Sequence, residues 1–357
     1  MPYSRRCRQA QDLLIREEVD ALLVTDKANR YYLSGFTGSS GYLLLTADRV
    51  FLLTDFRYLV QANQQAECCE VVNQGKDWYE TLKQLLTCHQ VKKLAFEQDH
   101  LSHSQYLKLA EKVDHCNLVG KQNLVEKLRE TKDFLELGLM KKAASIADKA
   151  FSELLEVIRP GRSELEVAAD LEYFMRRLGS EGPALDTIVA SGIRSALPHG
   201  TAGEKKLELG DLVVIDFGAT YQGYCSDMTR TVIIGAATPK QRTVYQLVLE
   251  AQLAGLQAIR AGQLCQQVDG VARRIIAEQG YGAYFGHSLG HGVGLNIHEN
   301  PRLADGNQLP LKKGMVVTVE PGIYLDDWGG IRIEDMVAVT DDGCEIFTKT
   351  TKELIEI

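Results

Sequence analysis

Residues 1–125 alternate short apolar runs with helical patterns. The apolar runs predict strands at Ala21–Thr25, Gly41–Thr46, Val50–Thr54 and Leu94–Phe96. Two segments have the periodicity of helices, Tyr79–Leu86 and Ser102–Val113, and the second begins with a capping box formed by Ser102 and Gln105. This alternation predicts a small α/β domain.

The segment Ser34–Gly41 is rich in glycine and serine. A phosphate-binding loop is conceivable there, but the lysine of a P-loop is missing. The composition therefore favours a tight hairpin or a loop at the rim of the domain.

From residue 126 onward the helices are longer. Asp133 to Ile158 predicts a helix, and a second helix begins at the capping box of Ser163 and Glu166 and ends at Gly179. A later helix begins at Thr238-Pro239. Because 357 residues exceed what one hydrophobic core usually supports, we expect two domains, residues 1–125 and residues 126–357.

The second domain contains an internal repeat. Ile158-Arg-Pro-Gly161 matches Ile259-Arg-Ala-Gly262, an offset of 101 positions (262 − 161). Further on, the segment from Gly210 matches the segment from Gly314, an offset of 104 (314 − 210). The repeat predicts two related α/β halves that pack about a pseudo-twofold axis.

Each half carries two carboxylates on a predicted hairpin. In the first half, Asp216 ends the apolar run Leu212–Phe217, and the chain returns through Asp227 after a turn centred near positions 221–222. This register places Asp216 roughly opposite Asp227. A carboxylate at the end of a buried strand needs partners or a metal, because burying a bare charge is very costly.

The second half repeats this arrangement. Met315–Glu320 predicts a buried strand, and the chain returns as Ile331–Val339, which contains Glu334. The midpoint of positions 320 and 334 is 327, inside the predicted turn, so these two glutamates should face each other. If the halves pack together, four carboxylates converge, and two divalent cations would neutralise them and activate water. The alternative, unrelated surface hairpins, is disfavoured by the matched repeat.

The histidines divide between the two domains. The first domain has four in polar, loop-like contexts, where we expect surface residues: His89, His100, His103 and His115. In the second domain, His287, His291 and His298 lie close together among glycines that allow close backbone approach, and His199 lies apart. Three histidines in one such segment favour a functional site.

Charge and cysteine content indicate which binding partners and which cellular location to expect. The formal net charge is −8 and no cluster of Lys and Arg occurs, which argues against nucleic acid or an anionic membrane as the main partner. No stretch approaches the length of a membrane span. The eight cysteines form no CxxC pair, which favours reduced thiols in a cytoplasmic protein.

Five residues now define a family resemblance. Asp216, Asp227, His291, Glu320 and Glu334 follow one another with spacings of 11, 64, 29 and 14. With their flanking residues they resemble the ligand set of the pita-bread metallopeptidases. The first domain is similar to the creatinase/prolidase-type N-terminal domain, and the second to the catalytic domain of aminopeptidase P and prolidase. The resemblance implies an α/β (α+β) fold with a creatinase-like domain and a pita-bread domain.

The resemblance also implies a metal site. Asp216 would chelate one ion, His291 and Glu320 the other, and Asp227 and Glu334 would bridge both. Oxygen ligands with one imidazole suit two Mn²⁺ ions, although Co²⁺ or Zn²⁺ would also bind. Cys225 is either a thiolate ligand or a small core residue, and the second reading is favoured because five ligands already fill the site.

Catalytic and substrate-binding roles follow from the same resemblance. His298 would contact the scissile carbonyl and stabilise its oxyanion, and Glu320 would pass a proton to the leaving nitrogen. His199, counted with them as catalytic, would also wall the substrate pocket together with His287. Arg332 matches the arginine of the Xaa-Pro branch and would bind substrate.

The implied function is that of a metallo-aminopeptidase, which hydrolyses the N-terminal Xaa-Pro bond of short peptides. We expect a cytoplasmic homodimer whose partners are peptides with proline at position 2. A strict Xaa-Pro dipeptidase remains an alternative, since Arg332 could serve either enzyme, and so does a broader aminopeptidase. The intact ligand set disfavours creatinase and a non-catalytic peptide-binding module, and Arg332-Ile333 disfavours methionine aminopeptidase.

Overall fold

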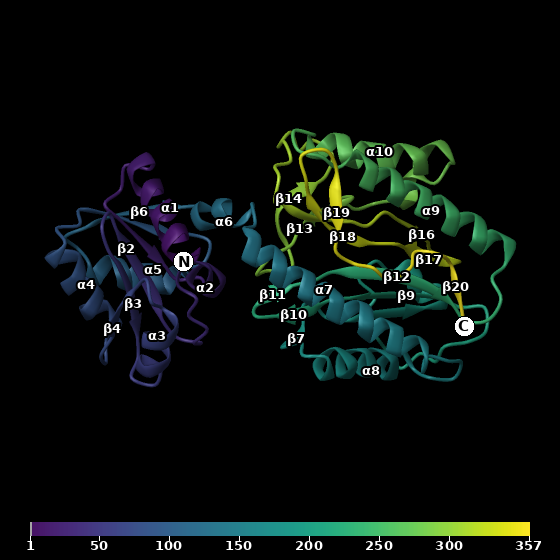
Figure 1. Cartoon of the computed structure of the whole chain (residues 1–357), viewed down its shortest axis with the longest axis horizontal. Helices are drawn as coiled ribbons and strands as arrows, with labels where there is room; N and C mark the ends of the chain where they lie inside the picture. Colours follow the sequence, from purple (N-terminus) through teal and green to yellow (C-terminus); the bar gives the residue numbers. More distant parts are fainter. Residues whose placement is uncertain (1) are drawn as a thin grey trace. The chain divides into compact units, whose positions relative to one another are not determined.

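Strand β1 (Ala21–Val24) lies inside a mixed sheet in the N-terminal part of the computed structural model (Figure 1). The structure describes residues 2–357, so Met1 of the predicted first domain lies outside the described residues. The strand order is β4-β3-β2-β1-β5-β6, in which β1 pairs antiparallel with β2 and parallel with β5. The strands are β1, β2 (Tyr42–Thr46), β3 (Val50–Thr54), β4 (Glu70–Asn73), β5 (Lys93–Glu97) and β6 (Asn117–Lys121).

Helices surround this sheet. They are α1 (Pro2–Arg16), α2 (Lys27–Ser34), α3 (Leu59–Gln65), α4 (Trp78–Cys88), α5 (His103–Lys112) and α6 (Leu124–Arg129). The predicted strands and the capping box before α5 are confirmed. Sequence patterns did not predict β4, in which Val71 and Val72 are the apolar residues and no residue is fully buried. They also did not predict α1, which buries Cys7, Ala10 and Leu14 along one face.

The glycine-rich segment is a loop that joins α2 to β2, and not a hairpin. Helix α2 ends at Gly35, whose φ of 76° lies in the left-handed region. The buried guanidinium of Arg30 donates hydrogen bonds to the carbonyl oxygens of Gly38, at 2.6 Å, and of Gly41. The loop therefore directs carbonyl oxygens at a cation, which is the reverse of a phosphate cradle.

The described chain divides into two compact units, and the boundary lies between Arg129 and Glu130. Position 125, where the sequence suggested the boundary, falls inside α6. The C-terminal unit contains the helices α7 (Phe134–Leu155), α8 (Glu164–Arg177), α9 (Pro239–Ala258) and α10 (Cys265–Glu278), with short 3₁₀ turns at Gly192–Ala196 and Gly282–Tyr284. The mixed helix and sheet content of both units confirms the predicted fold class.

The strands of the C-terminal unit fall into two groups. The first is β7 (Gly182–Pro183), β8 (Ile188–Ser191), β9 (Leu212–Phe217), β10 (Ala219–Tyr221), β11 (Tyr224–Cys225) and β12 (Met228–Ile233). The second is β13 (Gly290–Gly292), β14 (Glu299–Leu303), β15 (Val316–Val319), β16 (Gly322–Leu325), β17 (Gly329–Arg332), β18 (Asp335–Val339) and β19 (Cys344–Ile346). The last strand, β20 (Ile355–Glu356), pairs with β12. In Figure 1, α7 and α8 lie on one side of these strands, and α9 and α10 lie on the other.

Each pair of helices forms a core with its own group of strands. Side chains of α7 and α8 pack with β9 and β12, whereas side chains of α9 and α10 pack with β15 and β18. The capping residues Asp133, Ser163 and Thr238 accept hydrogen bonds from the backbone of the helices that they begin. Within residues 2–357, no helix combines the length and apolarity that crossing a membrane requires.

The repeat is visible in matched backbone geometry. Gly161 and Gly262 have φ angles of 87° and 86°, and their N–H groups donate to Leu207 O and Leu311 O, both at 2.8 Å. Gly210 and Gly314, which precede β9 and β15, have φ angles of 94° and 86°. These pairs confirm that the two halves share one local fold.

The matched glycines allow a test of the packing around the repeat. Replacing Gly210 by Ala should cost about 1 kcal/mol, from backbone strain alone, because a Cβ there meets open space. Gly314→Ala should cost more, about 2 kcal/mol, because its Cβ would lie 3.0 Å from Lys132 O. Denaturant unfolding measures both. Gly138→Ala, on the exposed side of α7, is the control and should stabilise by about 0.5–1 kcal/mol. Equal costs at Gly210 and Gly314 would contradict this account.

Candidate metal centre

The first carboxylate pair lies on the hairpin of β9 and β12. Tyr221 pairs with Tyr224 at its tip, and Gln222 and Gly223 have φ angles of 46° and 76°, as a type I′ turn requires. The same register continues down to Asp216, which pairs with Thr229 and not with Asp227. The predicted register is therefore wrong by two residues. Because a shift of two keeps each side chain on its face of the hairpin, Asp216 and Asp227 still share a face.

The second carboxylate pair lies between two paired segments. Val319 pairs with Asp335 on one side, and Gly322 pairs with Arg332 on the other, in one continuous register. This register places Glu320 opposite Glu334, as predicted. The chain turns between Leu325 and Gly329, which form the last pair.

The two halves meet at Thr229. Its carbonyl oxygen accepts a hydrogen bond from the Glu334 N–H at 3.1 Å, and its hydroxyl donates to Glu334 Oε2 at 2.6 Å. The residue that pairs with Asp216 in the first half thus holds Glu334 of the second half. The two carboxylate pairs converge for this reason.

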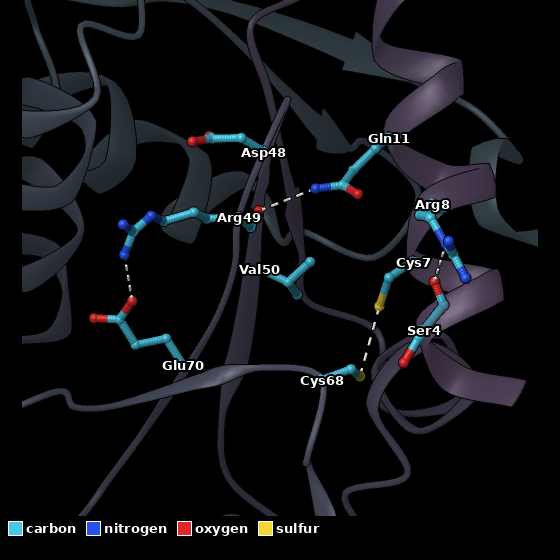
Figure 2. Close-up of a pocket in the computed structure, with 9 residues that line it drawn as sticks. All are labelled: Ser4, Cys7, Arg8, Gln11, Asp48, Arg49, Val50, Cys68 and Glu70. Atoms are coloured by element: carbon cyan, nitrogen blue, oxygen red, sulfur yellow. Dashed lines mark hydrogen bonds and ion pairs between the residues drawn. The ribbon is translucent and has the colours of Figure 1, made fainter. Parts of the chain in front are cut away.

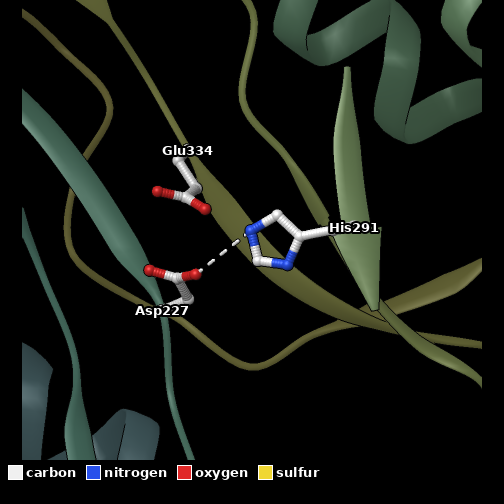
Figure 3. A group of neighbouring side chains, drawn as sticks. All are labelled: Asp227, His291 and Glu334. Carbon is white, nitrogen blue, oxygen red and sulfur yellow. Dashed lines mark ion pairs between the residues drawn. The ribbon is translucent and has the colours of Figure 1, made fainter. Parts of the chain in front are cut away.

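His291 completes the cluster from the adjacent strand β13 (Figure 3). Its Nε2 lies 3.5 Å from Asp227 Oδ2 and 3.3 Å from Glu320 Oε1. Potential ligand atoms of Asp227, His291 and Glu334 all lie within 4.8 Å of one another. His291 Nδ1 lies 3.0 Å from Gly292 O, a contact that assigns the ring proton to Nδ1 and leaves the Nε2 lone pair directed at the carboxylates.

Burial and electrostatic repulsion both act against ionisation in this cluster. Burial, followed by the charges of Asp216 and Glu320, raises the pKa of Asp227 well above its usual value. Burial and the charge of Asp227 do the same to the pKa of Glu334, and burial also raises the pKa of Glu320. Burial lowers the pKa of His291, so the ring is neutral. The cluster therefore resists full ionisation of its carboxyl groups, and its own imidazole supplies no positive charge.

One buried oxygen of the carboxylate cluster lacks a partner among the described residues. Asp216 Oδ2 accepts a hydrogen bond from Arg332 Nη2 at 2.7 Å, but Asp216 Oδ1 has none. A buried carboxylate oxygen without a partner costs free energy, and a cation would satisfy it. Carboxylate oxygens with one neutral imidazole are a donor set that fits divalent cations such as Mn²⁺.

Behind Asp216, a polar chain links Arg332 to His287. Arg332 Nη1 donates to the Tyr324 hydroxyl at 2.9 Å and to Pro198 O at 3.2 Å, and its Nε donates to the Thr229 hydroxyl at 3.1 Å. The Tyr324 hydroxyl lies 3.0 Å from His287 Nε2. Arg332 is thus buried and held by internal contacts.

The other predicted site residues lie on the open side of the cluster. His298 is exposed, and its ring centroid lies 4.3 Å from that of His291. Burial of its inner side, and then His291, lowers the pKa of His298, with a smaller contribution from His199. His199 is exposed and is near enough to act on His298 electrostatically. Cys225 is buried and pairs with Thr220, as expected of a core residue.

Two threonines of the site were not predicted. Thr229 holds Glu334, and the Thr318 hydroxyl contacts both the His291 N–H, at 3.0 Å, and Glu320 Oε1, at 2.9 Å. Each lies two positions from a carboxylate, so the alternation of side chains along a strand could have identified them.

Comparisons with known proteins agree with this geometry. A family model described as metallopeptidase family M24 matches residues 138–341. A second, described as the creatinase/prolidase N-terminal domain, matches residues 6–131. An Xaa-Pro dipeptidase of Pyrococcus horikoshii is 40% identical over 354 residues, covering 99% of this chain and 99% of that protein.

Two solved structures are similar along almost their whole length. An Xaa-Pro dipeptidase from Bacillus anthracis is 45% identical, with a TM-score of 0.98, over 99% of this chain and 100% of that chain. An X-Pro aminopeptidase from Thermotoga maritima is 43% identical, with a TM-score of 0.91, over 95% of this chain and 98% of that chain.

Because the carboxylates repel one another, Glu334→Gln should raise the thermal stability of the metal-free protein and reduce the stabilisation that metal gives. Glu334→Gln removes a buried carboxyl group that its neighbours repel and keeps the shape of the side chain. The metal-free variant should melt above the metal-free parent, by about 2–4 °C for each kcal/mol of repulsion relieved. It should also lose most of the stabilisation that Mn²⁺ gives the parent.

Thermal unfolding with and without Mn²⁺ measures both effects. Glu278→Gln, at the exposed end of α10, is the control and should change neither. A Glu334→Gln protein that Mn²⁺ stabilises as much as the parent would exclude Glu334 as a ligand.

Proposed function

The chain belongs to metallopeptidase family M24 and is a metal-dependent hydrolase of peptide bonds, and on that premise we propose that it cleaves the N-terminal Xaa-Pro bond of short peptides. The observation that carries the proposal is the convergence of four carboxylates and one neutral imidazole. Relatives named for Xaa-Pro dipeptidase and X-Pro aminopeptidase activity support the choice of bond.

Asp216, Asp227, His291, Glu320 and Glu334 would hold two divalent cations. When bound, such ions supply Lewis acidity and activate water for attack on a carbonyl. Asp227 and Glu334 are the best candidates for shared ligands, because each is buried and repelled by more than one neighbouring carboxylate. Arg332 and Thr229 orient Asp216 and Glu334 through hydrogen bonds.

Glu320 and His298 would handle the proton and the oxyanion. The leaving nitrogen of a proline is a tertiary amide without a hydrogen, so it must gain a proton to leave. The Thr318 hydroxyl fixes one carboxyl oxygen of Glu320, which suits this residue to carry that proton. His298 is exposed beside His291, where it can donate to the substrate carbonyl as negative charge develops.

His199 and His287 would wall the pocket for the proline ring. His287 is fixed by Tyr324 and by Ser288 O at 2.9 Å, so its ring presents a rigid face. Arg332, expected from sequence to bind substrate, would have to exchange an internal contact to do so. We therefore assign it first to positioning Asp216 and Tyr324.

A strict Xaa-Pro dipeptidase is the second candidate, favoured by the names of two of these relatives. We also propose Mn²⁺ as the native ion, a cytoplasmic location and a homodimer. The donor set supports the ion. The eight cysteines, none of which forms a disulfide in the described residues, support the location. The homodimer rests on the family resemblance alone.

Substrate selectivity tests the proposed reaction. With Mn²⁺ present, kcat/KM should be far higher for Xaa-Pro-Yaa than for a matched Xaa-Ala-Yaa peptide. A proline ring fits a rigid pocket with little loss of freedom, whereas alanine adds an N–H group that lacks a partner. An Xaa-Pro dipeptide measured in parallel separates the two candidates, since a strict dipeptidase would cleave it and leave the tripeptide intact. Equal rates on the proline and alanine peptides would contradict the proposal.

His298 can be tested separately from the ligands. His298→Ala should lower kcat by about 10²–10³-fold, as loss of an oxyanion donor does, and leave the stabilisation by Mn²⁺ unchanged. His103→Ala, on the exposed start of α5, should leave kcat unchanged. A normal kcat for His298→Ala would remove this residue from the reaction.

A further inference from the structure

Three cysteines of the N-terminal unit lie together, far from any proposed ligand in the sequence. Cys7 lies in α1, and Cys68 and Cys69 lie in the segment between α3 and β4. Cys68 Sγ is 3.8 Å from Cys7 Sγ, a contact that Figure 2 shows. It is also 3.8 Å from Cys69 Sγ, so Cys68 is the central sulfur.

The central sulfur can be reached from solvent. One pocket is lined by Cys7 and Cys68 together with the side chains of Arg8 and Arg49. A second pocket, lined by Tyr3, Gln65 and Glu67, also reaches Cys68. Cys7 itself is buried, and its thiol donates to Leu33 O at 3.2 Å. A small oxidant would therefore reach the Cys68 sulfur first, and the buried Cys7 sulfur lies next to it.

From this arrangement we propose that Cys68 is a peroxide-reactive cysteine that forms a disulfide with Cys7. The site lies beyond the peptidase reaction and does not depend on it. Cys7 is the better partner, because a disulfide between the adjacent residues Cys68 and Cys69 would strain the backbone that joins them. The two sulfurs must approach from 3.8 Å to about 2.05 Å, which rotation of side chains already in contact can achieve.

The reaction balances with hydrogen peroxide as oxidant. The Cys68 thiolate attacks one peroxide oxygen, an S–O bond forms, the O–O bond breaks and hydroxide leaves. Cys7 then loses its proton to that hydroxide and attacks the Cys68 sulfur. The S–S bond forms as the S–O bond breaks, and a second hydroxide leaves. This hydroxide takes a proton from solvent to become water, which balances the proton that Cys68 released when it ionised. Two thiols and one peroxide thus give one disulfide and two waters.

Cys68 must react with peroxide before Cys7 does, and it is the more acidic of the two thiols. Hydrogen bonds from Cys69 and Cys7 lower the pKa of Cys68, whereas the hydrogen bond with Cys68 raises the pKa of Cys7. Cys68 is therefore the more acidic of these two thiols and the better nucleophile. In a reducing compartment, thiol exchange would restore both residues, so the bond would form only during exposure to peroxide.

The full-length protein is treated with an equimolar amount of hydrogen peroxide, and the remaining thiols are then alkylated with N-ethylmaleimide. Mass spectrometry of the digested protein identifies the linked and the alkylated peptides. We expect the Cys7 peptide linked to the peptide that contains Cys68, and two fewer alkylated cysteines, both reversed by dithiothreitol. Cys68 should be oxidised at least about tenfold faster than the exposed Cys88.

Single variants assign the bond. Cys69→Ser and the control Cys88→Ser should still form the link, and Cys68→Ser should abolish it and leave Cys7 open to alkylation. A link that requires Cys69, or a parent protein whose Cys7 and Cys68 both remain alkylated after peroxide, would overturn the proposal. The parent protein alone shows whether Cys7 is linked to the peptide that contains Cys68, even if a variant fails to fold.

Discussion

Mutual repulsion of carboxylates in one buried centre is the constraint on which the C-terminal unit depends. Asp227 and Glu334 are almost fully buried, and burial, followed by the charges of neighbouring carboxylates, raises the pKa of each. The imidazole of His291 is neutral and directs a lone pair at the same space. Such a cluster lowers the stability of the fold unless cations occupy it. Metal binding should therefore stabilise the folded C-terminal unit.

The scaffold holds this repulsive arrangement by strand pairing. Asp216 and Glu320 are placed by the antiparallel registers of β9 with β12 and of β15 with β18, and each register extends beyond the carboxylates on both sides. Backbone hydrogen bonds of two sheets therefore fix the positions of the charges. Thr229 joins the halves, because it pairs with Asp216 and donates to Glu334.

A second layer of polar residues sets the orientation of the ligands and of the substrate wall. Arg332 contacts Asp216, Thr229 and Tyr324, and Tyr324 in turn contacts His287. A change in Arg332 would thus affect both the metal site and the proposed proline pocket. The internal contacts of Arg332 thus connect one metal ligand to the residue that contacts His287.

The sequence by itself determined the two-part fold, the repeat and the carboxylate pairs, because turn glycines, capping boxes and buried strands are local signals. Gly161, Ser163 and Thr238 lie where their local chemistry requires them. Within the first hairpin the sequence placed the turn wrongly, since several turns were compatible with the same glycine. Only the tertiary structure decided that Thr229 of the first half holds Glu334 of the second, that Arg332 is held inside the protein, and that Cys7 meets Cys68. Each of these contacts joins residues of different elements, and pairing across such separations depends on how the sheets and helices pack, which no local pattern encodes.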